Sequence, residues 1–306
     1  MHFRARVGIW LFALSPFNNV LACDVCGSSV SSQSLGLLPQ FSKHFVGVQY
    51  LYATSQSSHP SLFEGKPNEE SSQVYQYTQL WGRFQINKRF QLFAFVPYVH
   101  NSNTELGNNT ISSGIGDVSA MVNYSFLIAE KANRKSMLLG GIGIKMPTGA
   151  FNSGNNAQRN GLPNTQRGTG SWDVVSNINY TQKGKKWGFN IDASYTLTTA
   201  NKWQYKFGNR ANLAAVAFYW LEYKQFKIVP QTGIRAEHAL HDYDHYGKKW
   251  LNEKTGGVMT FATLGTQLFF KNFGAKATVS VPAYQQYAAG YVRSNSRFEG
   301  GIFILF

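Results

Sequence analysis

The chain ends in the stretch EGGIFILF, residues 299–306, whose last five residues are all apolar. Chain ends usually fray into water, so an apolar last residue contributes little to a soluble domain. The stretch is explained if the final strand is hydrogen-bonded on both sides and one of its faces meets an apolar medium. An ordinary apolar edge strand is the alternative, and the rest of the sequence has to decide between the two.

Alternate residues of a strand share one face, and here that face carries Phe298, Gly300, Ile302, Ile304 and Phe306. Closing a sheet into a barrel removes the unpaired edge, which would be very costly in lipid. The tail also resembles the assembly signal of outer-membrane barrels, in which a polar residue, a glycine and two alternating hydrophobic residues end the chain. The corresponding positions are Glu299, Gly301, Ile304 and Phe306. We therefore expect outer-membrane lipids and the barrel assembly machinery as partners.

The composition departs from that of a soluble domain. Only 14% of the 306 residues are charged, against roughly 25% in typical soluble domains, while 43% are hydrophobic and 15% aromatic. Beyond the N-terminus no stretch of about 18 apolar residues occurs, so we expect no membrane-spanning helix in the mature chain. A fold that spans a membrane would have to be built from strands.

Apolar and polar residues alternate with a period of two along most of the chain, which predicts strands. The segments with this pattern are 44–55, 72–86, 89–100, 114–127, 135–147, 169–181, 185–198, 204–221, 225–238, 257–270, 274–285 and 294–306. Short and long connections alternate between them, with the short connection 199–203 as an exception. The sequence therefore predicts an all-β fold, a transmembrane antiparallel β-barrel of about 12 strands with long outer loops and short periplasmic turns. We expect it in the outer membrane of a Gram-negative bacterium.

Aromatic residues recur eight positions apart on one face of three predicted strands, in the pairs Phe90 and Tyr98, Trp172 and Tyr180, and Trp187 and Tyr195. Eight residues span about 27 Å along a strand. At a tilt of about 40° this is a rise of roughly 20 Å, near the apolar band of about 25 Å between two aromatic girdles. The opposite faces of the last two of these strands carry Asn, Asp, Ser and Thr, which predicts a lumen that faces water.

The N-terminus reads as a processing segment. A basic start with Arg4 and Arg6 precedes an apolar run at 7–14, and compact residues precede Cys23. This pattern predicts a secretory signal peptide over residues 1–22, cleaved after Ala22. Residues 23–43 then form an N-terminal periplasmic or plug segment, and residues 44–306 form the barrel.

Two cysteines, Cys23 and Cys26, lie directly after this cleavage site in the stretch CDVCG. In an oxidising periplasm a disulfide is the default for such a pair. Two other interpretations stay open. Cys23 would carry a lipid if the chain were a lipoprotein, or the two thiolates would contribute to a site for a soft metal such as copper.

Three stretches resemble a family of outer-membrane proteins named after the MetA pathway of phenol degradation. They are GIGDVSAMVNYSF (114–126), GGIGIKMPTGAF (140–151) and GTGSWDVVSNINYT (168–181). The family carries a glycine-aspartate opening of one strand, a later Pro-Thr-Gly at a strand end, and a Gly-Thr-Gly opening of the next. The resemblance implies a channel or transporter of small compounds and identifies no solute.

Charged residues on the predicted inner faces are the candidate lumen-lining groups. They are Arg83, Asp117, Lys145, Asp173, Asp192, Lys206, Arg210, Arg235, Glu237, Lys276, Arg297 and Glu299. Ionisable side chains at membrane depth face water or each other because isolation in lipid is costly. They predict either a charged constriction that selects solutes or a salt-bridged network that fills a narrow barrel.

The formal net charge of +14 would suit an anionic partner. Its lysines and arginines, however, crowd the predicted periplasmic turns, where they meet lipid phosphates or stay solvated. We expect no nucleic-acid partner and no cofactor. The stretch EHALHDYDHYG (237–247) offers His238, His241 and His245 as weak metal candidates. Because this stretch lies at a predicted strand end and outer loop, a solvated polar segment is the favoured interpretation.

These features predict an outer-membrane channel or transporter for a small solute, with a hydrophobic or aromatic compound as one candidate. A plugged barrel with a structural or surface-interaction role is the alternative. An outer-membrane lipid hydrolase is the third reading, because such enzymes carry Ser and His on the outer face of a barrel. The sequence shows no catalytic motif, and neither His44 nor His100 has a partner that can be recognised in it. The prediction is therefore that the protein is not an enzyme.

Overall fold

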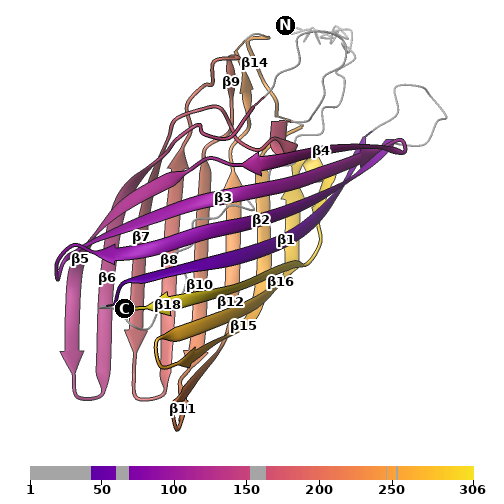
Figure 1. Ribbon diagram of the computed structural model, residues 1–306. Coiled ribbons are helices and arrows are strands. Elements are labelled where there is room, and N and C mark those ends of the chain that lie inside the picture. Colours follow the sequence, from indigo (N-terminus) through magenta and orange to yellow (C-terminus); the bar gives the residue numbers. More distant parts are fainter. Residues whose placement is uncertain (1–42, 60–68, 152–162, 246, 253) are drawn as a thin grey trace, which may run out of the picture.

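The computed structural model describes residues 43–59, 69–151, 163–245, 247–252 and 254–306. The predicted signal peptide, Cys23 and Cys26 lie outside the described residues. Within them, twelve strands pair antiparallel in chain order, and the last pairs with the first to close a barrel (Figure 1). The strands are β1 (Phe45–His59), β2 (Glu69–Gln85), β3 (Phe90–Glu105), β5 (Ser119–Lys131), β6 (Arg134–Lys145), β7 (Asp173–Lys183), β8 (Trp187–Leu197), β10 (Arg210–Tyr219), β12 (Phe226–Ala239), β15 (Gly257–Phe270), β16 (Phe273–Tyr287) and β18 (Arg297–Leu305). The predicted barrel of about 12 strands is confirmed.

The remaining elements extend the barrel strands or lie in the connections between them. Strand β4 (Asn108–Ile115) forms a hairpin with β3, β11 (Leu221–Tyr223) extends β12, and β17 (Val292–Ser294) joins β1 and β16. A separate outer sheet contains β9 (Tyr205–Lys206), β13 (Tyr243–Asp244) and β14 (Lys249–Trp250). Two 3-10 turns are η1 (Pro163–Thr165) and η2 (Ala288–Gly290). The hairpin of β3 and β4 thus occupies the connection between the strands predicted over 89–100 and 114–127.

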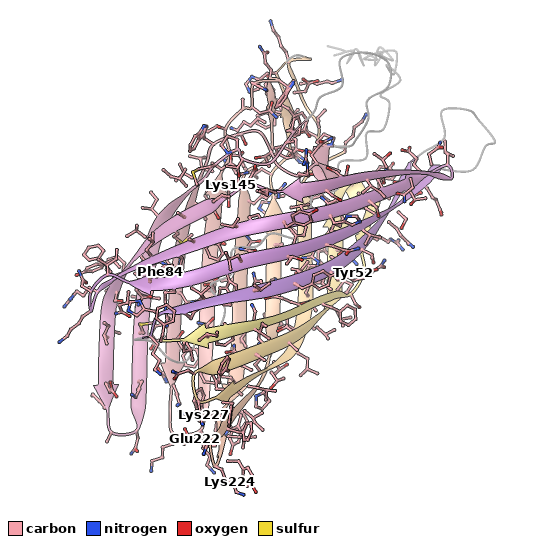
Figure 2. The ribbon with its side chains drawn as sticks, in the orientation of Figure 1. Tyr52, Phe84, Lys145, Glu222, Lys224 and Lys227 are labelled. Carbon is pink, nitrogen blue, oxygen red and sulfur yellow. The ribbon has the colours of Figure 1, made fainter. Side chains whose placement is uncertain are left out.

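The two ends of the barrel differ as the sequence predicts. Tight turns join β2 to β3, β5 to β6, β7 to β8, β11 to β12 and β15 to β16 at one end, while the long connections lie at the other. Figure 2 shows Glu222, Lys224 and Lys227 at the tight-turn end, away from Lys145. We call the tight-turn end periplasmic and the loop end outer. The part of the chain that the structure describes holds no helix that is long and apolar enough to span a membrane.

The outward face of the barrel is apolar. Leu264 and Ile302 expose 68% and 67% of their surface although both lie within strands. Aromatic side chains on the same face include Phe90, Tyr98 and Trp187. A soluble protein would leave such a continuous apolar belt in water, whereas a transmembrane barrel places it in lipid.

The C-terminal stretch closes this belt. On β18, Ile302 and Ile304 point outward, while Phe303 and Leu305 are buried inside the barrel. Two backbone hydrogen bonds, with N–O distances of 3.0 and 3.1 Å, join Phe306 to His44, which directly precedes β1. They lie at the seam where β18 pairs with β1. The two rings also stack at 5.4 Å. The apolar chain end is therefore a paired strand between two neighbours, and the edge-strand alternative is wrong.

The interior is less polar around the whole barrel than on the inner faces of β7 and β8, from which a lumen facing water was predicted. Buried rings fill much of it, and we call the set Phe45, Trp81, Phe93, Phe95, Phe218, Phe269 and Phe303 the aromatic layer. The polar inner faces of β7 and β8 do not continue around the barrel, because β1, β2, β3 and β18 carry bulky rings inward. Side chains of this size occupy the interior of a narrow barrel.

If the outward face of the barrel meets lipid, a charge introduced on that face should lower the stability of the barrel by an amount that depends on its depth. Ile178 lies at the middle of β7 and is 60% exposed, and Ile86 in a periplasmic turn is 63% exposed. Arginine at the bilayer midplane costs about 2–4 kcal/mol, but only about 0–1 kcal/mol near the interface. We expect Ile178→Arg to lower the free energy of unfolding in lipid vesicles by the larger amount and Ile86→Arg by the smaller. Equal denaturant midpoints for the two variants would contradict a lipid-facing β7.

Candidate functional site

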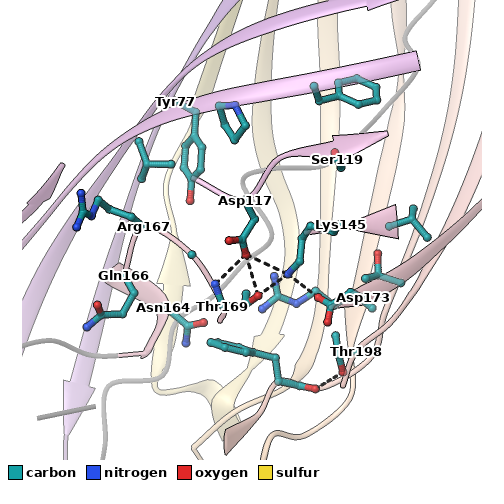
Figure 3. A pocket seen from close by; sticks show the side chains of 18 of the residues that line it. Tyr77, Asp117, Ser119, Lys145, Asn164, Gln166, Arg167, Thr169, Asp173 and Thr198 are labelled. Atoms are coloured by element: carbon teal, nitrogen blue, oxygen red, sulfur yellow. Dashed lines mark hydrogen bonds and ion pairs between the residues drawn. The ribbon is translucent and has the colours of Figure 1, made fainter. Parts of the chain in front are cut away.

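The three stretches that resemble the family meet at the outer end of the barrel (Figure 3). Lys145 ends β6, and its ammonium lies 2.5 Å from the carboxylate of Asp173, which begins β7. It also lies 3.4 Å from the carboxylate of Asp117, which precedes β5. The hydroxyl of Thr169 accepts a hydrogen bond from Lys145 at 2.5 Å. We call Asp117, Lys145, Thr169 and Asp173 the outer clamp.

Asp117 binds the backbone of two outer connections at once. One carboxylate oxygen accepts from the N–H of Gly149 at 3.0 Å. The other accepts from the N–H and the hydroxyl of Thr169, both at 2.8 Å. A Cβ on Gly168 would lie 2.4 Å from Asp117 Oδ1 and 2.7 Å from Gly149 Cα, so this close approach requires glycine. The outer clamp therefore joins the ends of β5, β6 and β7.

The segment that follows the longest outer connection is held at the mouth of the lumen. Asn101 on β3 donates to the carbonyl oxygens of Thr165 and Gln166 at 3.2 and 3.3 Å. The guanidinium of Arg167 donates to the carbonyl oxygen of Ser113 at 2.9 Å. Residues 163–169 are thus fixed between β3, β4 and the outer clamp.

Below this segment lies a cavity of about 130 Å³, which we call the outer cavity. Its apolar wall comes from Tyr77, Phe95, Pro97, Val99, Val175 and Phe207. Its polar wall comes from the outer clamp, Arg167, Ser194, Thr196, Thr198, Arg210 and Asn212. The outer cavity is therefore amphipathic and has room for a small molecule only.

A second, inner cavity of about 60 Å³ lies closer to the periplasmic end. Trp81 and Phe303 of the aromatic layer line one part of it. The charged groups Asp192, Arg235, Lys276 and Glu299 line another. The ammonium of Lys276 lies 2.5 Å from Glu299 and 4.6 Å from the centre of the Trp81 ring. Rings and ion pairs together narrow the lumen here.

One line of register across the inner wall of the barrel carries mostly polar side chains. Gln91, Asn123, Gly141, Asn177, Ser194, Asn212 and Glu237 pair successively from β3 to β12. Within the described chain, five of them hold a buried side-chain oxygen or nitrogen that has no hydrogen-bonding partner, and we call these the polar row: Gln91, Asn123, Asn177, Asn212 and Glu237. Buried atoms of this kind take water or solute as partners.

The predicted lumen charges fall into four places. Asp117, Lys145, Asp173 and Arg210 line the outer cavity, and Asp192, Arg235, Lys276 and Glu299 line the inner one. Glu237 and Arg297 form a buried ion pair at 2.8 Å, with the guanidinium 4.0 Å from the ring centre of Phe261. Arg83 is buried near the periplasmic end and donates to the carbonyl oxygen of Lys43 at 3.0 Å.

Lys206 is the exception. It belongs to β9 of the outer sheet, where it pairs with Tyr243, and it does not line either cavity. The predicted strand over 204–221 begins only at Arg210, because the chain first leaves the barrel to form β9. Alternation of inner and outer faces therefore does not extend to Lys206, and its assignment to the lumen was wrong.

The outer sheet is fixed to the barrel by a buried carboxylate. Asp242 accepts hydrogen bonds from the hydroxyl of Tyr205 at 2.5 Å and from the N–H of Gly208 at 2.6 Å. Burial raises the pKa of Asp242, and these hydrogen bonds oppose the rise. The sequence placed Asp242 only within the polar stretch 237–247. Its role was missed because its partners Tyr205 and Gly208 fall in the segment that was predicted as the start of a strand over 204–221.

The three histidines that were candidate metal ligands lie in separate surroundings. His238 faces outward from β12, His241 contacts the carbonyl oxygen of Thr255 at 2.5 Å, and the ring of His245 lies against Tyr243. Among the described residues, no three His, Cys, Asp or Glu side chains gather so that they could hold a metal ion.

His100 has a partner that the sequence did not reveal. Its Nδ1 lies 2.5 Å from the hydroxyl of Ser113 across the β3–β4 hairpin. A serine activated for attack also needs its histidine to be oriented by a third group. Among the described residues no carboxylate is paired with His100, so no group that would orient its ring in this way is seen there.

Comparisons with known proteins agree with this fold. The COG4313 outer membrane channel from Pseudomonas putida F1 superposes with a TM-score of 0.62 at 13% identity, over 92% of this chain and 100% of that one. The β domain of the Bordetella autotransporter Brka gives 0.50 at 8% identity, over 86% and 99%. At identities this low, the superpositions establish a shared fold and nothing more. No curated protein sequence matches.

Residues 70–245, more than half of the chain, match a family model described as "Putative MetA-pathway of phenol degradation". This range contains all three stretches on which the resemblance was based, and also the complete outer clamp. The resemblance is thereby confirmed, and the chain belongs to this family.

Proposed function

We propose that the protein is an outer-membrane channel for small, mainly apolar solutes, including compounds with one aromatic ring. The observation that carries the proposal is the aromatic layer inside a closed barrel. Its rings pack closely, with 4.4 Å between the centres of Phe45 and Trp81 and 6.1 Å between those of Phe45 and Phe303. A hydrated ion loses its water on entering such a layer at high cost, whereas an apolar solute exchanges one apolar contact for another.

The outer cavity supports the same solute class. Its volume of about 130 Å³ is close to the roughly 150 Å³ of an engineered apolar cavity that binds benzene. Its apolar wall would hold a ring. The aromatic layer comes mainly from β1, β2, β3 and β18, which lie on the near side of the barrel in Figure 1. Most of the polar row comes from β5, β7, β10 and β12. A solute with one polar substituent would meet both walls.

A plugged barrel is the second candidate. The small cavities and the ion pairs between Lys145 and Asp173, Lys276 and Glu299, and Arg297 and Glu237 favour it. Under that reading the charges stiffen the barrel, and the outer loops carry an interaction with a partner. The plug role of residues 23–43, of which only Lys43 is described, and the state of Cys23 and Cys26 stay predictions.

The proposal includes an outer-membrane location in a Gram-negative bacterium, with contacts to membrane lipids and insertion by the barrel assembly machinery. It assigns no catalytic step to the chain. Cells that lack their general porins and express this chain should take up labelled toluene faster than cells without it. A labelled hexose should enter both at the same rate. Equal toluene uptake by the two kinds of cell would remove the channel proposal in favour of the plugged barrel.

Thinning the aromatic layer should open the lumen to ions. Trp81 and Phe303 line the inner cavity, and their replacement by alanine in the double variant removes two rings from its wall. We expect single-channel conductance in planar bilayers to rise several-fold, because water and ions then replace apolar contacts. Trp187→Ala, which removes an exposed ring from the outward face, is the control and should leave conductance unchanged. If the conductance of the double variant equals that of the natural chain, the barrier to ions lies in another part of the lumen.

A further inference from the structure

Arg210 differs from Lys145 in the outer cavity because, among the described residues, no carboxylate lies within ion-pairing distance of it. It is the first residue of β10, and its guanidinium lies 5.9 Å from the ring centre of Phe207. In the described part of the chain it forms no ion pair and donates no hydrogen bond. Lys145 is neutralised by two carboxylates, and Arg167 donates to the carbonyl oxygen of Ser113.

The lining of the outer cavity therefore carries one surplus positive charge. Two carboxylates, Asp117 and Asp173, stand against the cations of Lys145, Arg167 and Arg210. A cation that is partly removed from water without a partner is unfavourable, so an anion that reaches it gains affinity. The surplus of one charge favours a monoanion, because a second negative group would meet the clamp carboxylates.

Asp242 is the remaining carboxylate that senses Arg210. The guanidinium lowers the pKa of Asp242 against the larger raising effect of burial. The oxygens of Asp242 accept from Tyr205 and Gly208, however, and no ion pair joins Asp242 to Arg210. The guanidinium thus keeps its planar edge for a ligand, and such an edge suits a carboxylate because two parallel N–H groups can donate to its two oxygens.

The rest of the outer cavity selects the body of the ligand. Phe95, Pro97, Val99 and Val175 form an apolar wall, and the volume of about 130 Å³ admits one ring and few further atoms. The hydroxyl-bearing residue Thr196 pairs with Arg210 in register between β8 and β10. One end of the outer cavity is therefore cationic and polar, and the wall beside it is apolar.

We propose that the outer cavity binds a small monocarboxylate with a single aromatic ring, with the carboxylate on Arg210 and the ring against the apolar wall. The inference rests on the proposed channel function and names the solute class that its outer site prefers. Benzoate is the simplest probe of this class. Benzyl alcohol has the same ring and a polar group but no charge, and it serves as the neutral comparison.

The test is calorimetric titration of the folded barrel in detergent with each probe. We expect benzoate to bind at least tenfold more tightly than benzyl alcohol. Arg210→Gln should remove that preference and leave the affinity for benzyl alcohol within about twofold, while Arg210→Lys should keep part of it. Arg134→Gln removes an exposed arginine at a periplasmic turn and should keep all of it. Raising the salt concentration should weaken benzoate binding only, since salt screens the charge and not the ring contact.

Equal affinities for the two probes in the natural chain would overturn the assignment, and so would a benzoate preference that survives in Arg210→Gln. Heat-dependent electrophoretic mobility shows whether each variant is folded. If Arg210→Gln does not fold, a benzoate preference in Arg210→Lys as full as in the natural chain would count against the bidentate contact. The channel proposal fails separately, on equal toluene uptake, and a benzoate preference measured in detergent would remain valid in that case.

Discussion

Lys145→Met is expected to open the outer end of the barrel. The substitution keeps most of the side-chain volume but removes the ammonium that lies within 4 Å of two carboxylates, Asp117 and Asp173. Removing one partner of a buried ion pair costs about 3–5 kcal/mol, because the remaining charge is left uncompensated. Two such charges remain here, and they also repel each other. The outer clamp should therefore separate, and residues 163–169 should leave the mouth of the lumen.

Two measurements check this result. Single-channel conductance in planar bilayers should rise several-fold, and external protease should cut the outer connections of the variant in intact cells. The barrel itself should still migrate faster before heating than after, because its strand pairing is untouched. A variant whose conductance and protease resistance match those of the natural chain would show that the outer clamp does not hold the mouth closed.

A second substitution separates charge from shape. Asp173→Asn on the Lys145→Met background removes one of the two repelling charges and keeps an oxygen that can accept from Ser171 and from the N–H of Thr199. We expect this double variant to regain much of the lost stability, whereas Asp173→Asn alone should destabilise the chain. The four proteins form a double-mutant cycle, which measures the coupling directly. Additive effects would mean that the two residues act independently.

The strands could be predicted because their signal is local. Alternation of apolar and polar residues is a property of each segment, and it located β15 over 257–270 to the residue. It failed where the chain changes direction without a change in composition. Residues 169–172 read as part of a strand, but the backbone N–H of Thr169 donates to Asp117 instead of to a neighbouring strand, and β7 begins at Asp173.

The nature of the interior could be predicted only for part of the barrel. On β7 and β8 one face is apolar and the other holds Asn and Asp, so inside and outside are distinct. On β3 the stretch FQLFAFV (90–96) has rings on both faces, and hydrophobicity alone does not tell which ring meets lipid. The aromatic layer became visible only when closure of the barrel placed Phe93, Phe95 and Trp81 on its inner side.

The candidate site shows the same limit. The sequence predicted that Asp117, Lys145, Asp173 and Arg210 face inward, but not which of them would meet. Lys145 comes within reach of both carboxylates because pairing of β5, β6 and β7 places residues far apart in the chain at one outer edge. Arg210 lies beside Thr196 on the same inner wall, and within the described chain no ion pair joins it to a carboxylate. That difference between two cations depends on distances of a few ångströms, which no pattern of residues encodes.

Deletion of Phe306 is expected to reduce the amount of assembled barrel about tenfold, more than any substitution that leaves the chain length unchanged. Leu305 has no exposed surface and packs within the same buried cluster as the aromatic layer. Without Phe306, the terminal carboxylate would sit on Leu305, where burial of an unpaired charge costs several kcal/mol. The deletion also removes both backbone hydrogen bonds to His44 across the seam between β18 and β1.

Phe306→Ala separates these causes from recognition of the ring by the assembly machinery. The alanine variant keeps the carboxylate at position 306 and both hydrogen bonds to His44, and it loses only the ring that stacks on His44. We expect it to assemble to an intermediate level, measured as the fraction of membrane protein that migrates fast before heating. If Phe306→Ala is as defective as the deletion, the ring itself is what the machinery reads. If the deletion assembles normally, the final strand does not need its last residue to close the barrel, and the apolar chain end would have no structural role.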